Sequence, residues 1–251
     1  MARILLQFGW RWAFGAVGAA GLLWIVLWWP SYHTPARVVR RESALPVRLL
    51  FRNRFVWMFT LSKIFLDPVW YFYIFWFPEY LKAARHFDMA SIGRFAWIPF
   101  LVAGFGNILG GAFTAFLVRC GLSSSAALKW AVTAFAACMA AAIPAVLVDN
   151  VWISIACVSV AMVGYTGSLA NMLAFPAAIF PGNLVGSVYG IGSMGAGFGG
   201  MVFALFTGWL VDRYSYTPVF FGFGCIPFIA MVIIWRFMGP LRPAPEFAEQ
   251  H

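Results

Sequence analysis

Two opposite charges stand in the middle of a long apolar stretch of this sequence. Lys63 and Asp67 are the only charged residues well inside any of seven such stretches. Each charge near the centre of a membrane helix costs about 2.5–3.5 kcal/mol on insertion scales. A spacing of four residues puts both side chains on one helix face, where the charges partly neutralise each other. Such a pair at membrane depth indicates a solute or proton pathway.

A proline follows this pair directly. Pro68 has no N–H, so the carbonyl of Ile64 loses its helical hydrogen-bond donor. A free carbonyl beside two charges is tolerated in a bilayer where the helix faces protein or water rather than lipid. The structural alternative for Lys63 is a side chain that extends toward the cytoplasmic end of the helix. The acidic partner lies deeper in the membrane, which favours a functional pair.

Two aromatic residues follow on the same side of the predicted helix. Trp70 and Tyr71 come three and four residues after Asp67. Aromatic rings can stack on the apolar face of a pyranose, and the Tyr71 hydroxyl can form a hydrogen bond. The alternative is a role in the aromatic belt at the membrane surface.

A second polar face has spacings of four, three and four residues, and its members are Gly164, Ser168, Asn171 and Phe175. Pro176 again frees a carbonyl, that of Met172. The amide, the hydroxyl and this carbonyl together suit the oxygens of a sugar or a carboxylate. An interhelical hydrogen bond of about 0.6 kcal/mol explains the buried amide equally well.

Glycines dominate the stretch from 186 to 200. Its GxGxxG pattern follows no strand and lies inside an apolar stretch, which excludes a dinucleotide site. Two GxxxG pairs, Gly186/Gly190 and Gly195/Gly199, favour close helix packing. The alternative is backbone exposed along a translocation path, with Ser193 as a polar contact.

The composition excludes most other classes of protein. The chain has 251 residues, of which 63% are hydrophobic and 10% are charged, whereas soluble domains carry about 25% charged residues. Membrane proteins collect Arg and Lys in their cytoplasmic loops, which explains the net charge of +9. We therefore expect no nucleic-acid partner. The spacing of Cys and His residues offers no metal site. We therefore expect no cofactor and no enzymatic activity.

Seven segments satisfy the length of a membrane helix. Their ranges are 12–29, 55–78, 95–118, 131–148, 151–180, 184–210 and 217–235. The loop 31–54 carries six arginines against one acid, which places it in the cytoplasm. Alternation from there puts four more basic residues inside: Arg119, Lys129, Arg236 and Arg242. The predicted fold is an all-α integral membrane protein with seven helices.

The last six predicted helices form two similar triplets. The first helix of each ends in Phe-Pro (Phe77-Pro78 and Phe180-Pro181), and the second helix of each is rich in glycine. Internal symmetry of this kind is typical of secondary transporters. The first helix lies outside the symmetry. We therefore expect residues 1–30 to be the last helix of a missing amino-terminal half, 31–54 a cytoplasmic central loop, and 55–251 a six-helix carboxyl-terminal half.

Several motifs resemble the hexuronate transporters, in the anion–cation symporter branch of the major facilitator superfamily. They are Gly9-Trp-Arg-Trp-Ala-Phe14, Lys63-x-x-x-Asp67-Pro68-x-Trp70-x-Phe72, Phe75-Trp-Phe-Pro78-x-Tyr-Leu81, Trp97-Ile-Pro-Phe-Leu101 and Phe180-Pro-x-x-x-Val-Gly-Ser-Val188. The resemblance covers nearly the whole chain. It implies helices six to twelve of that fold, located in a bacterial inner membrane, and proton-driven uptake of sugar acids such as glucuronate or galacturonate. It also implies that Lys63, Asp67, Asn171 and the region of Ser193 lie beside the substrate.

The sequence departs from the family pattern at three places. An acid is expected where Gly104 stands, an Asp-Arg pair where Ala115-Phe116 stands, and an Asp where Ala178 stands. The expected partners are the lipid bilayer, a sugar-acid anion, a proton and a missing amino-terminal half. The alternative function is a non-transporting remnant or half-transporter that acts as an interaction partner in the membrane.

Overall fold

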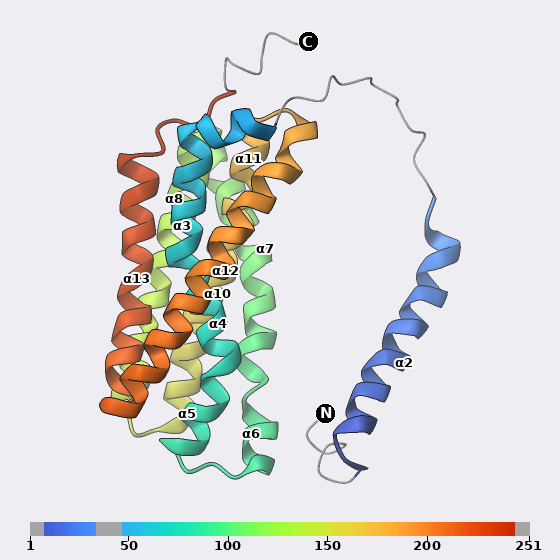
Figure 1. Cartoon of the computed structure of the whole chain (residues 1–251), viewed down its shortest axis with the longest axis vertical. Helices are drawn as coiled ribbons and strands as arrows, with labels where there is room; N and C mark the ends of the chain where they lie inside the picture. The colour runs from blue at the N-terminus through green and yellow to red at the C-terminus, as the bar shows by residue number, and fades with distance from the viewer. Residues whose placement is uncertain (1–7, 34–46, 244–251) are drawn as a thin grey trace.

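The computed structural model describes residues 8–33 and 47–243, and within these ranges it contains helices and no strand (Figure 1). This agrees with the all-α prediction. Most of the predicted cytoplasmic loop, residues 34–46, lies outside the described residues.

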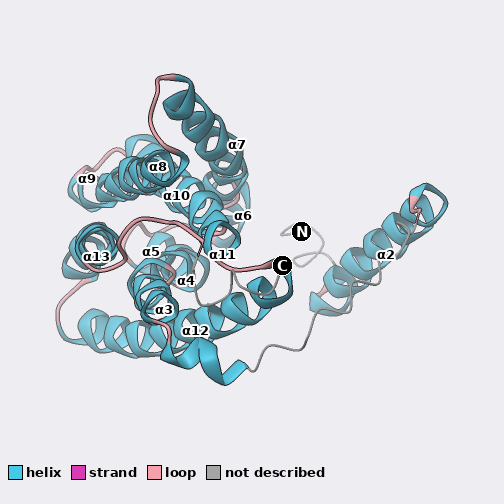
Figure 2. Cartoon of the chain, turned by 90° about the horizontal axis from the view of Figure 1, so that it is seen from above, coloured by secondary structure: helices cyan, strands magenta, loops and turns pink. Residues whose placement is uncertain are grey.

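The first helix stands apart from the others in both views (Figures 1 and 2). Helix α2 (Trp10–Trp28) and the short η1 (Trp29–Ser31) contain no buried residue. Large apolar side chains such as Phe14 (74% exposed) and Leu22 (67% exposed) point away from it on all sides. A helix that is apolar all round is suited to a lipid environment.

Six helical segments in the described chain are long and apolar enough to cross a membrane. They are Trp10–Ser31, Met89–Arg119, Ser124–Leu147, Val151–Ile179, Gly182–Arg213 and Tyr216–Arg236. The predicted span 55–78 is not among them, so the count of seven is not confirmed. Lys63, Asp67 and several Trp and Tyr side chains make that stretch less apolar than the others.

The stretch around the charge pair is a helix with two breaks. After η2 (Val47–Arg52), the chain forms α3 (Arg54–Leu66), α4 (Pro68–Phe75) and α5 (Phe77–Ala83). The prediction that Phe77-Pro78 ends this helix is wrong. Pro78 lies in the first turn of α5, where its missing N–H leaves no helical hydrogen bond unmade, and the helix continues beyond it.

The remaining elements follow with short connections: α6 (Met89–Phe95), α7 (Ile98–Arg119), α8 (Ser124–Cys138), η3 (Met139–Ala141), α9 (Ala142–Leu147), α10 (Val151–Met172), α11 (Ala174–Ile179), α12 (Gly182–Arg213) and α13 (Tyr216–Arg236). Ser123 caps α8 by accepting a hydrogen bond from the Ala126 N–H. Because of this cap, α8 begins seven residues before the predicted boundary at 131. Lys129 therefore lies inside the helix instead of in a loop.

The first helix of each triplet packs against helices of the other triplet. Helix α3 packs mainly against α12 and α13, and α10 packs mainly against α7 and α8 (Figure 2). The first helix of each triplet thus packs on the second and third helices of the other. Figure 1 shows α3 and α10 running in opposite directions, so the two triplets are inverted relative to each other, as the repeats of many secondary transporters are.

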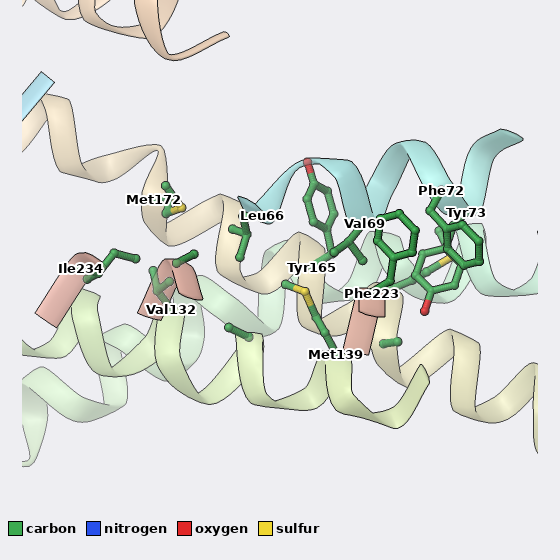
Figure 3. Close-up of a cluster of buried hydrophobic side chains, with 14 of the residues drawn as sticks. Leu66, Val69, Phe72, Tyr73, Val132, Met139, Tyr165, Met172, Phe223 and Ile234 are labelled. Atoms are coloured by element: carbon green, nitrogen blue, oxygen red, sulfur yellow. The ribbon is translucent and has the colours of Figure 1, made fainter. Parts of the chain in front are cut away.

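Aromatic and aliphatic side chains together fill the interior between the triplets (Figure 3). The Phe72 ring of α4 stacks on Phe223 of α13 with centroids 4.4 Å apart, and it meets Phe220 edge-on at 5.1 Å. This cluster joins α4 firmly to α13.

The two ends of the six-helix body differ in charge. One end holds the start of α3, the end of α7, the start of α8 and the end of α13 (Figure 1). Its charged residues in the described chain are all basic: Arg48, Arg52, Arg54, Arg119, Lys129, Arg236 and Arg242. The opposite end carries four acids, Glu79, Asp88, Asp149 and Asp212, among four basic residues. The first end is therefore the cytoplasmic one by the positive-inside rule.

Candidate functional site

The predicted charge pair forms a direct ion pair at the junction of α3 and α4. The Lys63 Nζ lies 2.6 Å from an Asp67 carboxylate oxygen, and the side chains are only 8% and 7% exposed. Asp67 is the C-cap residue of α3 and directly precedes Pro68, the first residue of α4. Lys63 thus turns toward the deeper carboxylate and does not extend to the cytoplasmic end. The prediction that the two side chains share one helix face and can pair there is confirmed.

A third polar group completes this cluster. The Tyr165 hydroxyl of α10 donates a hydrogen bond to the other Asp67 carboxylate oxygen at 3.3 Å. Its ring stacks on Trp70 at 5.4 Å with an interplanar angle of 18°. Figure 3 shows Tyr165 among the buried side chains near Leu66 and Val69. Tyr165 was not among the residues predicted for the site. Its position midway along an apolar helix was a usable signal, because membrane tyrosines favour the helix ends.

Glycines of α12 bring that helix against the charged segment. A Cβ atom at Gly192 would lie 2.5 Å from the Phe59 ring and 3.1 Å from Cδ of Lys63. A Cβ atom at Gly199 would lie 2.4 Å from the carbonyl oxygen of Ile64. This is the carbonyl that Pro68 deprives of its helical donor, and it faces protein as the sequence predicts.

The two GxxxG pairs have different surroundings. Gly195 packs on Thr60 and Gly199 on Ile64, which confirms close packing for that pair. The described residues do not bear out packing for Gly186/Gly190, since none of them lies within 4 Å of either Cβ position. This pair lies on another side of α12, which α3 does not cover.

The two predicted aromatic residues have unlike environments. Trp70 lies between Tyr165 and Phe100, so one face of its indole is already covered. Tyr71 is half-buried and stacks on Phe75 with an interplanar angle of 7°. It borders a groove of about 300 Å³ between α4 and α12, whose lining residues are Tyr71, Phe75, Gly197, Gly200, Met201 and Ala204. Tyr71, unlike Trp70, therefore opens onto free space.

The polar face of α10 is occupied by helix contacts. The Asn171 side-chain oxygen accepts a hydrogen bond from the Thr114 hydroxyl of α7, and its amide nitrogen donates to the Gly167 carbonyl at 2.8 Å. The Ser168 hydroxyl donates to the Val132 carbonyl of α8 at 3.2 Å. In the described chain, no hydrogen bond connects either residue to Lys63 or Asp67. The geometry supports the interhelical interpretation of Asn171.

Ser193 lies on the open side of α12. It is exposed, and its helical neighbours Gly190 and Gly197 have free space around their Cβ positions. Gly197 also lines the groove beside Tyr71. The structure therefore brings Ser193 and Tyr71 to one side of α12 and leaves Ser168 and Asn171 elsewhere.

Comparison with known proteins identifies the family. The family model described as Major Facilitator Superfamily matches residues 119–250. The chain belongs to the major facilitator superfamily. This major facilitator protein is an integral membrane protein surrounded by the lipid bilayer. Among its described residues, no three His, Cys, Asp or Glu side chains come together as metal ligands would.

The curated relatives carry names of sugar-acid transporters. A protein named hexuronate transporter from Escherichia coli is 24% identical over 98% of this chain and 62% of its own length. One named probable L-galactonate transporter, also from Escherichia coli, is 30% identical over 56% of this chain and 35% of its own length. One named D-galactonate transporter is 23% identical over 83% of the chain and 55% of its own length. The chain thus spans less than two thirds of these relatives.

Proposed function

We propose that this chain forms the carboxyl-terminal half of a proton-coupled sugar-acid transporter in a bacterial inner membrane. The buried Lys63–Asp67 ion pair, at a break in a membrane-depth helix, is the observation that carries the proposal. The names of the relatives support hexuronates or aldonates as the substrate class.

The ion pair suggests how a proton and an anion are coupled. Protonation of Asp67 removes its negative charge and leaves the Lys63 ammonium without a partner. Breaking a buried pair in this way costs about 3–5 kcal/mol. A substrate carboxylate that binds Lys63 restores neutrality, because one proton and one monoanion together add no net charge to the site. Each ligand therefore makes the binding of the other more favourable.

Other residues around the pair have supporting roles in this proposal. The open Tyr71 ring and its groove offer a stacking surface for the sugar, and Ser193 offers a hydroxyl on the same side of α12. Trp70 holds the Tyr165 ring in place. Asn171 and Ser168 fix α10 against α7 and α8, and Tyr165 is on that helix.

Uptake of radiolabelled glucuronate into proteoliposomes, with and without an imposed proton gradient, tests the proposal. We expect Asp67→Asn to abolish concentrative uptake, whereas Asp88→Asn serves as the matched control. Asp88 is exposed and caps α6, and hydrogen bonding by the Ser91 side chain, together with the Ser91 N–H, holds the pKa of this carboxyl below its ordinary value. Asparagine caps a helix about as well. Unchanged uptake by the Asp67→Asn variant would remove Asp67 from the mechanism.

A second function, that of a membrane interaction partner without transport, is favoured by one observation. Helix α2 buries none of its residues against the described part of the chain, which leaves its surface for another protein or for lipid. Saturable uptake by the wild-type chain alone would exclude this function.

A further inference from the structure

A second pocket lies at the cytoplasmic end of the body, between the start of α8 and the end of α13. Its volume is about 560 Å³. The lining residues that bear on its chemistry are Ser123, Ser125, Lys129, Trp235 and Arg242. The pocket shares no lining residue with the groove beside Tyr71.

The most informative residue in this pocket is a buried lysine. Lys129 is only 5% exposed, and its Nζ donates hydrogen bonds to the carbonyls of Ile234, at 3.2 Å, and Gly239. In the described part of the chain, ion pairs involve Lys63 and Lys82 but not Lys129. Two carbonyls satisfy two of the three ammonium protons but do not neutralise the charge. A buried cation of this kind favours an anion as its third partner.

Two further features make the pocket attractive to an anion. Arg242 is exposed at its edge. The first turn of α8 faces it. Among the described residues, the Ser123 side chain caps the Ala126 N–H alone, which leaves other N–H groups at the helix start for a ligand. The Ser125 hydroxyl accepts a hydrogen bond from the Leu241 N–H at 2.8 Å, which holds the segment after α13 against α8. The pocket wall is thereby fixed.

The surface next to the pocket is suited to acyl chains. The rings of Trp130 and Trp235 meet at 5.0 Å, and the two residues are 50% and 42% exposed. The Trp235 indole N–H donates to the Thr133 hydroxyl at 2.8 Å, which fixes the ring. Tryptophans favour the depth of the lipid headgroups. Below them α13 exposes Val232 (58%) and Ile229 (45%), so apolar surface continues from the pocket into the membrane.

We propose that this pocket binds the phosphate of an anionic phospholipid from the cytoplasmic leaflet. Lys129 and Arg242 bind the phosphate, and the acyl chains lie over Trp130 and Trp235. Basic pockets between helices on the cytoplasmic side have the charge and position for such headgroups. The proposal does not depend on the transport function.

Native mass spectrometry of the purified full chain, with equal amounts of phosphatidylglycerol and phosphatidylcholine, tests the proposal. We expect the wild-type chain to retain phosphatidylglycerol about tenfold better than phosphatidylcholine. Arg242→Gln should weaken that preference about fivefold, and Lys129→Gln should weaken it more. Lys82→Gln is the matched control, because Lys82 is 63% exposed at the opposite end. Arg242 is exposed, so its variant keeps the test valid even if Lys129→Gln fails to fold.

Three results would overturn the proposal. The first is equal retention of both lipids, or an unchanged preference in the Arg242→Gln variant. The second is displacement of the lipid by millimolar inorganic phosphate, which would identify a site for free phosphate. The third concerns Glu246 and Glu249, which follow Arg242 in the sequence and lie outside the described residues. Lipid retention that appears only after both become Gln would show that these carboxylates occupy the pocket.

Discussion

The two inverted triplets each contain a broken first helix, and the two breaks carry different chemistry. The break between α3 and α4 holds the Lys63–Asp67 ion pair. Close to the break between α10 and α11 stands Asn171, a neutral amide whose oxygen and nitrogen both have protein partners. The first helix of each triplet is therefore interrupted, but the polar groups near the two interruptions differ.

This difference separates groups that can change partners from groups that hold the fold. The Asn171 amide bonds Thr114 and Gly167, and neither partner changes charge in the physiological range. The carboxylate of Asp67 can gain a proton, and the ammonium of Lys63 can then accept another anion. The break that holds Lys63 and Asp67, here called the charged break, is thus the candidate functional site. The break beside Asn171, here called the neutral break, is thus the candidate for a purely structural role.

The largest expected effect is at the charged break. Asp67→Asn should lower the free energy of unfolding by about 3–5 kcal/mol, because it leaves Lys63 buried without a counter-ion. The double variant Lys63→Met/Asp67→Asn should recover at least half of this loss. Unfolding in detergent, with the double-mutant cycle, measures both effects. If the loss of unfolding free energy in the double variant equals the sum of the losses in the two single variants, Lys63 and Asp67 do not interact.

The next effect concerns the contact between the charged segment and α12. Gly199→Ala should cost about 1–3 kcal/mol, because its Cβ would meet the backbone oxygen of Ile64 at 2.4 Å. Gly190→Ala is the matched control on the same helix and should be neutral or slightly stabilising. The same unfolding measurement compares them. Equal costs would contradict the assignment of the packed and open sides of α12.

A smaller effect is expected where α10 meets the ion pair. Tyr165→Phe keeps the stacking on Trp70 and removes the hydroxyl that donates to Asp67, which should cost about 1 kcal/mol. Tyr214→Phe removes a hydroxyl from an exposed tyrosine and serves as the control. The Tyr165 effect should vanish when Asp67 is already Asn. If it persists undiminished, the hydroxyl does not act through Asp67.

The smallest effect is expected at the neutral break. Asn171→Leu or Thr114→Val should each cost about 0.6 kcal/mol, the average for a hydrogen bond between membrane helices. The double variant should cost little more than either single one, because one shared bond is lost. A loss at Asn171 as large as that at Asp67 would remove the distinction between the two breaks.

The sequence predicted the charged break well because its parts are local. A spacing of four residues fixes the geometry of Lys63 and Asp67, and a proline fixes which carbonyl is freed. Tyr165 could not be assigned to the pair, since it comes from a helix 98 residues later. For Ser168 and Asn171 the spacing predicted a common face. It did not predict that one would contact α8 and the other α7.

The fold was predictable in type and less so in its boundaries. Apolar length alone located most helices, and the glycine-rich second helix of each triplet indicated the internal symmetry. The stretch around Lys63 has too many polar and aromatic side chains to stand out by hydropathy. Capping by Ser123 moved the start of α8, so the buried Lys129 was mistaken for a loop residue. Caps depend on single hydrogen bonds, which hydropathy does not register.

The ion pair also has a consequence for the order in which the chain is made. Helix α3 finds its main contacts on α12 and α13, and Gly192 lies 125 residues after Asp67. At about 5–20 residues per second, the ribosome adds those residues in roughly 6–25 seconds. During that interval α3 still lacks its main packing partners, α12 and α13. Because both charges belong to the same helix, their mutual neutralisation is available as soon as α3 and the start of α4 have formed, before any partner helix has been synthesised.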